Sequence, residues 1–267
     1  MLLEQSGKDY LAELYGKVIE NVQKTTVSDK IKNTDLSGDP EAGSVEAKRF
    51  ANATAKTYGT ARANGKGDGV TVRPVTIKID NDKEIVEELE EKDVRLYGVD
   101  GVLEKRAANH VQVMASALDT AFFAEAKSAG TQVTLQATAI EDKVEEMIQT
   151  LETVKNDFVD GVPREMMSIV CTPKVYGQLR TYLDKVTNVN IDSTVDEFVA
   201  YHGVKIFSSV HMPASTDIIV MADGAVAEPV MSHQYSAEKI PLSNAYGVEL
   251  FYSYGVGAAA PDLIFYA

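Results

Sequence analysis

The chain has 267 residues, of which 45% are hydrophobic and 25% charged, and this length suffices for a core that folds without disulfides. Its net charge of −14 argues against a general basic footprint for nucleic acid. The single cysteine, Cys171, excludes an internal disulfide and fits a reducing compartment. No apolar run is long enough to cross a membrane, and the N-terminus lacks a signal-peptide pattern.

Residues 6–24 are predicted to form a helix that starts at Ser6 and carries its apolar side chains at three- and four-residue spacing. Residues 25–43 are polar and are interrupted by Gly38, Pro40 and Gly43, which predicts a loop or an extended arm.

Residues 44–80 are predicted to form a long β-hairpin with a wide tip at 53–69. The returning limb, "VTVRPVTIKI", nearly alternates apolar and polar residues, and Pro74 within it favours an edge strand. The glycine-rich "NGKGDG" of the tip does not fit a phosphate-binding loop, because the spacing is wrong, Gly67 takes the hydroxyl position, and a strand follows where a helix is needed. A hairpin tip is the better interpretation.

Residues 81–98 are predicted to be an acidic connection that leads into a helix at about 101–128, ended by Gly130. The start of this connection has the spacing of a calcium loop, but Ile85 stands where that loop needs glycine. A solvated acidic face and a weak surface cation site are the remaining interpretations.

The last third alternates helix and strand. Thr138 and Glu141 have the spacing of a capping box before a helix, "MSIVC" is typical of a buried strand, and Thr172 with Pro173 starts a further helix. Further strands are expected at 204–209, 217–221, 225–231, 246–256 and 262–266. This order predicts a mixed α+β architecture.

No motif in the sequence predicts catalysis, and neither a metal nor a cofactor is expected. The four histidines, at positions 110, 202, 211 and 233, lack metal-ligand spacing. Cys171 lies in an apolar strand before a helix start, where an inert buried thiol is expected over a reactive thiolate. An enzyme with Cys171 or His110 in a cleft stays as an alternative.

Charge is distributed unevenly along the chain. Residues 44–80 have a net charge of +4, residues 81–93 of −5 and residues 140–267 of −10. A basic protrusion on an acidic body favours contact between copies of the chain, although chance clustering on a solvated surface gives the same pattern.

A hairpin of this length has no room to bury both faces on its own body, so its apolar side needs a partner. If the partner is another copy, the contact is heterologous and closes into rings. The sequence predicts that basic side chains of the hairpin meet acidic side chains of a neighbour. The basic candidates are Lys56, Arg62, Lys66 and Arg73, and the acidic candidates are Glu84, Glu87, Glu88, Glu90 and Glu91.

The order of elements resembles the major capsid proteins of tailed bacteriophages, which have the Hong Kong 97-type fold. The similar stretches are residues 75–130, with the return strand and long helix; "SIVCTPKVYGQLRTYLD"; "GVKIFSSVHMPA"; "IIVMADGAVAEPV"; and the final "YGVELFYSYGVGAAAPDLIFYA". The resemblance covers nearly the whole chain.

The resemblance implies an α+β fold with an N-terminal helix and arm at 1–43, an E-loop hairpin at 44–80 and a peripheral (P) domain with its spine helix at 81–139. An axial (A) domain would span 140–245, and C-terminal strands at 246–267 would return to the P domain. The covalent cross-link that some relatives make is not predicted.

The implied function is self-assembly into pentamers and hexamers of an icosahedral shell around double-stranded DNA. The implied partners are further copies, a separate scaffolding protein, a portal and a decoration protein, with weak contact to DNA and none to a membrane. Assembly would take place in the bacterial cytoplasm, and the product would be a virion capsid. An encapsulin-like compartment shell and a phage tail protein are alternatives from the same structural class.

Overall fold

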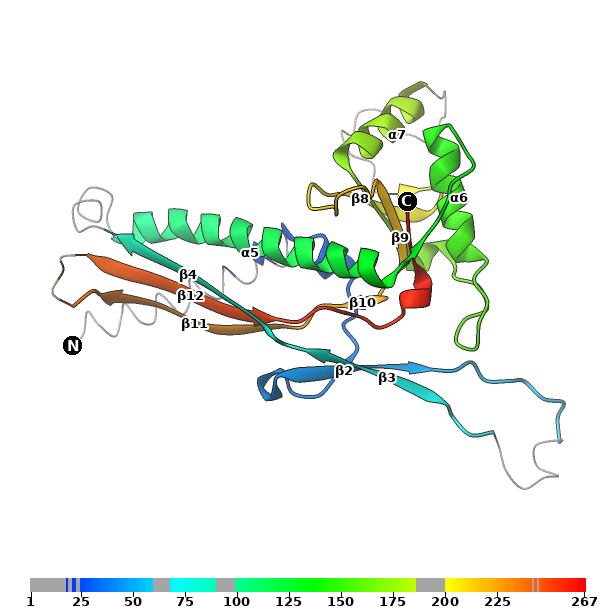
Figure 1. The fold of residues 1–267 in the computed structure, drawn as a ribbon, viewed down its shortest axis with the longest axis horizontal. Helices are drawn as coiled ribbons and strands as arrows, with labels where there is room; N and C mark the ends of the chain where they lie inside the picture. The colour runs from blue at the N-terminus through cyan, green and yellow to red at the C-terminus, as the bar shows by residue number, and fades with distance from the viewer. Residues whose placement is uncertain are drawn as a thin grey trace.

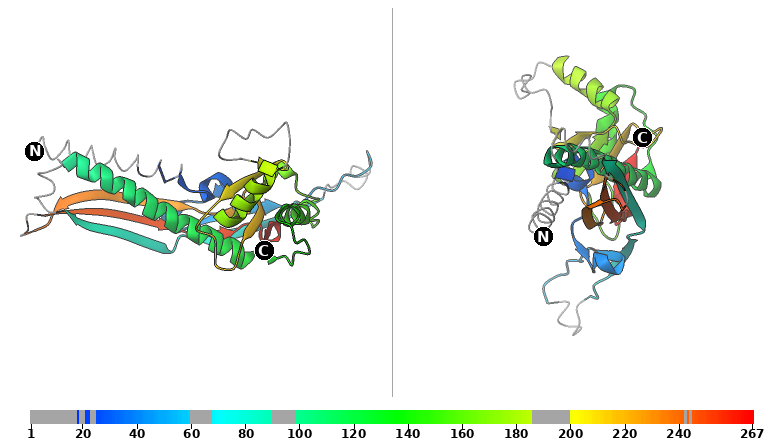
Figure 2. Two further views of the ribbon diagram at one scale, coloured as in Figure 1. Left: turned by 90° about the horizontal axis from the view of Figure 1, so that it is seen from above. Right: turned by 90° about the vertical axis from the view of Figure 1, so that its left-hand side faces the viewer.

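A computed structural model describes residues 25–59, 68–89, 99–185, 200–241 and 245–267, together with residues 18, 21, 22 and 243. The molecule has three parts, which are a compact α+β end, a long helix lying on a narrow sheet, and a hairpin that projects from the body (Figure 1). Figure 2 shows the same elongated shape from two further directions. Most of the helix predicted at 6–24 lies outside the described residues.

Helix α5, Val99–Ala129, is the longest element. The prediction of a helix at about 101–128 is confirmed, and the helix ends where expected. A side chain at Gly130 would place its Cβ 2.6 Å from the carbonyl oxygen of Ala126, so glycine is required by space at this exit. None of the helices in the described part of the chain combines the length and apolarity that a membrane span needs.

The N-terminal part of α5 packs on a three-stranded antiparallel sheet in the order β11-β12-β4. The strands are β11, Val230–Lys239, β12, Tyr246–Tyr254, and β4, Asn81–Leu89. The buried side chains between helix and sheet are Ala107, Val111, Met114, Ala115, Leu118, Val248, Leu250, Tyr252 and Tyr254, joined by Val18 and Val22 from the N-terminal region.

Strand β4 corrects the prediction that residues 81–98 form only a connection. Its nine residues pair in register with β12, from Asn81 opposite Tyr254 to Leu89 opposite Tyr246. As an edge strand it needs only one face on the core, and Ile85 and Leu89 supply that contact. The other positions of β4 do not pack on the core and are mostly charged. The sequence of this strand therefore lacks the apolar alternation by which a strand is predicted.

The projecting hairpin is built from β2, Ser44–Phe50, and β3, Val72–Lys78, with the short β1, Leu36–Ser37, on the other side of β2. The register runs from Ser44 opposite Lys78 to Phe50 opposite Val72, as predicted for an antiparallel pair. Pro74 lies in the edge strand of the order β1-β2-β3, where a missing N–H donor costs no ladder bond, so this prediction is confirmed.

The compact end contains a six-stranded mixed sheet in the order β5-β14-β9-β6-β8-β7. Its central strands β6, Met167–Cys171, and β9, Ile218–Ala222, are buried along their whole length. The outer strands are β8, Val204–Ser208, β14, Ile264–Tyr266, β5, Thr131–Gln132, and β7, Ala200–Tyr201.

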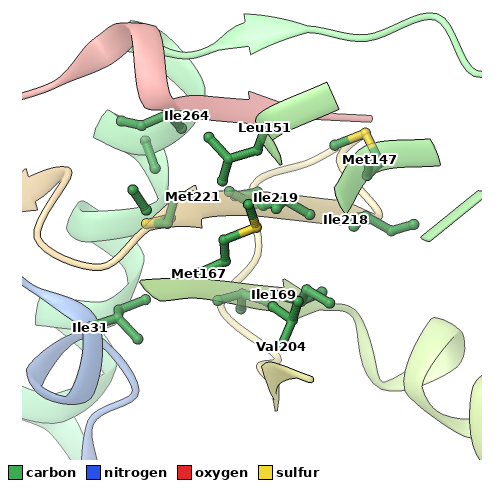
Figure 3. Close-up of a cluster of buried hydrophobic side chains, with 14 of the residues drawn as sticks. Ile31, Met147, Leu151, Met167, Ile169, Val204, Ile218, Ile219, Met221 and Ile264 are labelled. Carbon is green, nitrogen blue, oxygen red and sulfur yellow. The ribbon is translucent and has the colours of Figure 1, made fainter. Parts of the chain in front are cut away.

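Helices cover this sheet on both faces. Helices α6, Ile140–Glu152, and α7, Pro173–Lys185, contact each other and the strands, and the sheet lies between them and the C-terminal half of α5 (Figure 1). Figure 3 shows Met147 and Leu151 of α6 and Ile31 of the arm packed around the strands. Burial on both faces explains why β9 is a continuous apolar run and why β6 is apolar except for Ser168, whose hydroxyl donates a hydrogen bond to Asp223.

The predicted start of α7 agrees with the structure, whereas the predicted capping box before α6 does not. Thr172 Oγ1 accepts a hydrogen bond from the Val175 amide at 3.5 Å, so the predicted start of α7 at Pro173 is confirmed. The predicted capping box before α6 is wrong, since Ala139 is the N-cap and makes no side-chain bond. The carboxylate of Glu146 instead accepts bonds from the amides of Gln136 and Ala137.

Short helices and strands form the connections between the six-stranded sheet, the β11-β12-β4 sheet and the hairpin. The arm contributes η1, Pro40–Ala42, and α2, Ser28–Ile31, and the strand predicted at 225–231 divides into β10, Val226–Ala227, and the much longer β11. Strand β10 pairs with β13, Gly257–Ala258. The remaining turns are η2, Arg164–Met166, before β6, and η3, Pro261–Leu263, before β14.

Candidate assembly interface

The hairpin leaves the body at a fixed attachment built around Arg49 of β2. Its guanidinium makes two hydrogen bonds to the carboxylate of Asp262, at 2.5 and 2.9 Å, and lies 4.6 Å from the ring centre of Phe158. The Asn156 side-chain amide donates to the same carboxylate at 2.6 Å. Burial acts to raise the pKa of Asp262, but the hydrogen bonds and charge of Arg49 outweigh it and hold that pKa below its usual value.

Beyond this attachment the two limbs of the hairpin continue away from the body. Among the described residues, the outermost backbone bond between the limbs runs from the Ala51 amide to the Thr71 carbonyl oxygen at 2.9 Å. Large apolar side chains are nevertheless exposed here, with Phe50 at 57%, Tyr58 at 89% and Val70 at 77%. Exposed apolar groups gathered on a protrusion mark a contact surface.

The basic residues predicted for this surface are only partly described. Lys56 donates a hydrogen bond to Asp68 Oδ1 at 2.5 Å across the two limbs, and both side chains are solvent-accessible. Arg73 is exposed on the edge strand β3. Arg62 and Lys66 lie outside the described residues.

The acidic candidates divide between the two faces of β4. Glu84 and Glu88 are exposed on the face turned away from α5, with Val86, 57% exposed, between them. Because side chains alternate along a strand, these three residues form one acidic and apolar row at a sheet edge. Glu90 and Glu91 lie outside the described residues.

Glu87 lies on the opposite face of β4 and is engaged inside its own chain. Its carboxylate binds the guanidinium of Arg106 and the Nε2 of the buried His110, at 3.1 Å for the histidine. The hydrogen bond from Arg106, opposed by burial and helped by His110, lowers the pKa of Glu87. The strand alternation therefore separates Glu87 from the two glutamates that point outward.

The acidic row and the hairpin extend in opposite directions. Figure 1 shows β4 running along the extended sheet to one end, while the described limbs of the hairpin point to the other. The described basic residues of the hairpin and the outward glutamates of β4 therefore lie on parts of the chain that extend away from each other.

Cys171 and His110, the side chains considered for catalysis, are both buried. Burial raises the pKa of the Cys171 thiol to about 12, so the thiol is protonated and unreactive at neutral pH. Sequence reasoning predicted that the apolar side of the hairpin needs a partner, but it named only charged residues for the contact. The exposed Phe50 and Val70 of the hairpin and Val86 of β4 are the apolar residues that it did not name.

No protein-family model matches the chain, and no curated protein sequence matches it. Solved structures match it along most of its length. One from Mycobacterium phage Che8 has a TM-score of 0.63 at 18% identity and covers 84% of each chain. The capsid structure of cyanophage P-SCSP1u has a TM-score of 0.62 at 15% identity, with 88% of this chain and 85% of that chain covered.

A third match is the virus-like particle from Pyrococcus furiosus, with a TM-score of 0.59 at 12% identity, covering 96% of this chain and 98% of that one. The shared architecture shows the fold. The chain has the Hong Kong 97-type fold of capsid shells, with the hairpin, the long helix on its sheet and the compact α+β end in the expected order. The predicted fold class is confirmed.

Proposed function

We propose that this protein is a major capsid protein whose copies form the pentamers and hexamers of an icosahedral bacteriophage shell around double-stranded DNA. The observation that carries the proposal is the hairpin, which projects from the body (Figure 1) and exposes the large apolar side chains of Phe50 and Val70 in the part of the chain that the structure describes. The fold shared with a cyanophage capsid supports it. The role is structural and non-enzymatic.

The contact between copies would join the hairpin of one chain to the outward row of β4 in the next. Phe50 and Val70 would pack near Val86, and Arg73 and Lys56 would face Glu84 and Glu88. Each exposed ion pair is worth only about 1 kcal/mol or less, so the charges set register and the apolar contacts supply most of the attraction. Arg62, Lys66, Glu90 and Glu91 belong to the same proposal.

The proposed domain division follows the parts of the fold. Residues 1–43 would form the arm, 44–80 the E-loop, 81–139 the P domain with its spine helix and 140–245 the A domain, and 246–267 would return to the P domain. The sheets favour two changes to this division, because β11 pairs with β12 in the extended sheet and β14 joins the six-stranded sheet. The crossing between domains would therefore lie near residues 228–229.

Further partners belong to the proposal as well. A separate scaffolding protein, a portal and a decoration protein would accompany the shell, which would assemble in the bacterial cytoplasm. The net charge of −14 supports only weak contact with packaged DNA. A compartment shell is the second candidate, because the particle from Pyrococcus furiosus matches the chain almost from end to end.

The test is to express the chain alone and with its neighbouring genes and to examine the products by negative-stain electron microscopy. Closed shells or rings with five- and six-fold symmetry are expected. Shells from the chain alone would favour the compartment, and shells that need a second gene product would favour the phage capsid. A monomer under every condition would overturn both.

Deletion of residues 61–69 isolates the role of the hairpin. The deletion removes the tip and leaves the Arg49 attachment and both cores in place, so we expect a folded monomer with unchanged circular dichroism that forms no closed particles. Normal particles from the deleted chain would contradict the proposed contact.

A further inference from the structure

A buried polar junction attaches the arm to the body. Asp119 of α5, only 4% exposed, accepts hydrogen bonds from the amides of Val27 and Ser28, the latter at 2.9 Å. The arm is also held by backbone bonds to the turn after β9, where the amide of Gly224 donates to the Ile31 carbonyl oxygen at 2.8 Å. The spine helix therefore holds the first residues of α2 through one carboxylate.

A second carboxyl group lies in the same junction. Glu228 stands between β10 and β11, where the chain passes from the compact end to the extended sheet, and it is 2% exposed. Ser28 Oγ donates a hydrogen bond to its Oε2 at 2.8 Å. Its Oε1 has no hydrogen-bond partner among the residues that the structure describes.

The charged and titratable groups around Glu228 come from each element packed there. Asp29 and Lys32 lie on and after α2 and pair with each other at 2.6 Å, Asp119 comes from α5, and Tyr254 comes from β12. Burial is the main influence and raises the pKa of Glu228 to about 7; the Ser28 bond and Lys32 act against it, and Asp119 and Asp29 add to it. A buried carboxylate that has one hydrogen bond and lies near a second carboxylate is costly.

We propose that Glu228 is a protonation switch that controls the attachment of the arm. With Glu228 neutral, Ser28 stays bonded to it and α2 stays docked on Asp119. When Glu228 loses its proton, the junction holds an unbalanced buried negative charge, and the arm at residues 25–33 detaches so that water reaches the carboxylate. The switch belongs to the single chain and does not depend on shell assembly.

The sign of the pH dependence follows from the direction of the pKa shift. A carboxyl group whose pKa is raised on folding stabilises the docked state at low pH, and this contribution is lost as the pH rises toward and through about 7. The arm is therefore expected to be docked at mildly acidic pH and released at mildly alkaline pH.

Hydrogen exchange followed by mass spectrometry tests the switch in the full chain. After correction for the intrinsic rate, protection of residues 25–33 should fall by up to about tenfold per pH unit between the ordinary carboxyl pKa of 4.5 and about 7, as expected for one proton, and should level off at higher pH. Glu228→Gln keeps the shape without the charge, so its protection should be independent of pH. Glu165→Gln, which changes an exposed carboxyl on η2, should behave as the wild type.

A second variant covers the case in which Glu228→Gln does not fold. Ser28→Ala removes the bond that favours the ionised carboxyl, so the transition should move to higher pH. Equal pH dependence in wild type and Glu228→Gln would overturn the proposal. So would a carbon-13 NMR titration of the wild-type glutamate carboxyls in which no signal titrates near pH 7.

Discussion

At the residue scale, charged side chains that look interchangeable in the sequence have different structural roles. Arg164 holds two glutamates of α6, with its Nη2 2.7 Å from Glu145 Oε1 and 3.0 Å from Glu152 Oε2. His202 Nδ1 lies 2.7 Å from the other oxygen of Glu145. These contacts join α6 to the segment before β6 and to the turn between β7 and β8. The ion pairs therefore stabilise the packing of α6 against the edge of the six-stranded sheet.

Glu145→Gln is expected to lower the free energy of unfolding at pH 7 by roughly 1.5–3 kcal/mol, the usual range for a hydrogen bond to a charged group. The Arg164 bond, opposed by burial and helped by His202, lowers the pKa of Glu145 to about 2. A lowered pKa means that the stabilisation is present above the ordinary value of 4.5 and is lost as the pH falls toward 2.

Urea unfolding of both proteins between pH 7 and pH 3 measures this difference. The gap between wild type and variant should narrow as the pH falls. Glu88→Gln, whose side chain is exposed, serves as the control and should show no gap. A Glu145→Gln gap that stays constant with pH would contradict the assigned role of the ion pair.

At the element scale, the hairpin depends on a small number of contacts for its direction. Its own hydrophobic cluster is limited to Val45, Ala47 and Ile77 with neighbours from the body, namely Ala227 and Ala259. The Arg49 attachment lies farther out, beside the loop after α6, and a backbone bond from the Asn52 amide to the Asp157 carbonyl oxygen continues it. A two-stranded ribbon is marginal alone, so these bonds determine where the hairpin points.

Arg49→Ala is expected to free the hairpin without unfolding the body. The change removes two charge-assisted bonds and the contact with Phe158, about 1–3 kcal/mol of local attachment. Limited trypsin digestion should cleave the hairpin several times faster, while the main thermal transition stays nearly unchanged. Arg49→Lys should fall between, because lysine cannot make the bidentate contact. Unchanged cleavage rates would show that Arg49 does not hold the hairpin.

At the scale of the whole molecule, the basic hairpin and the acidic edge strand β4 extend in opposite directions (Figure 1). A contact between copies that uses these charges should depend on salt, because screening weakens exposed pairs. The proposed shell therefore predicts that encounter between copies slows as ionic strength rises, while the apolar contacts persist once they are formed.

Glu84→Lys is expected to slow particle formation severalfold and to leave the monomer as stable as the wild type. The residue is exposed on the outward face of β4 and makes no salt bridge within the part of the chain that the structure describes. Reversing its charge therefore changes only the sign of the proposed contact. Light scattering at low and high salt measures the rate. Glu165→Lys makes the same charge change on an exposed residue of η2 and should assemble normally. Equal slowing of both variants would reject the assigned contact.

Most elements with a strong local pattern could be predicted from the sequence. The long helix, the buried strand of Met167–Cys171, the hairpin and the proline start of α7 were recognisable because periodicity, capping and turn residues are local signals. Their order also indicated the Hong Kong 97-type fold. The exposed charges of the hairpin and of β4 were recognisable from composition alone.

The tertiary structure decided which face each residue occupies and which distant residues meet. β4 is a strand because β12 pairs with it, and this pairing turns Glu87 inward to Arg106 while Glu84 and Glu88 stay outside. Glu228, Ser28 and Asp119 are far apart in sequence, and only folding brings them into one junction. Helices and strands could be predicted because periodicity, capping and turn residues lie within a few positions of one another in the sequence. The attachment of the hairpin and the junction at Glu228 depend on contacts between distant residues, and short stretches of sequence do not encode those contacts.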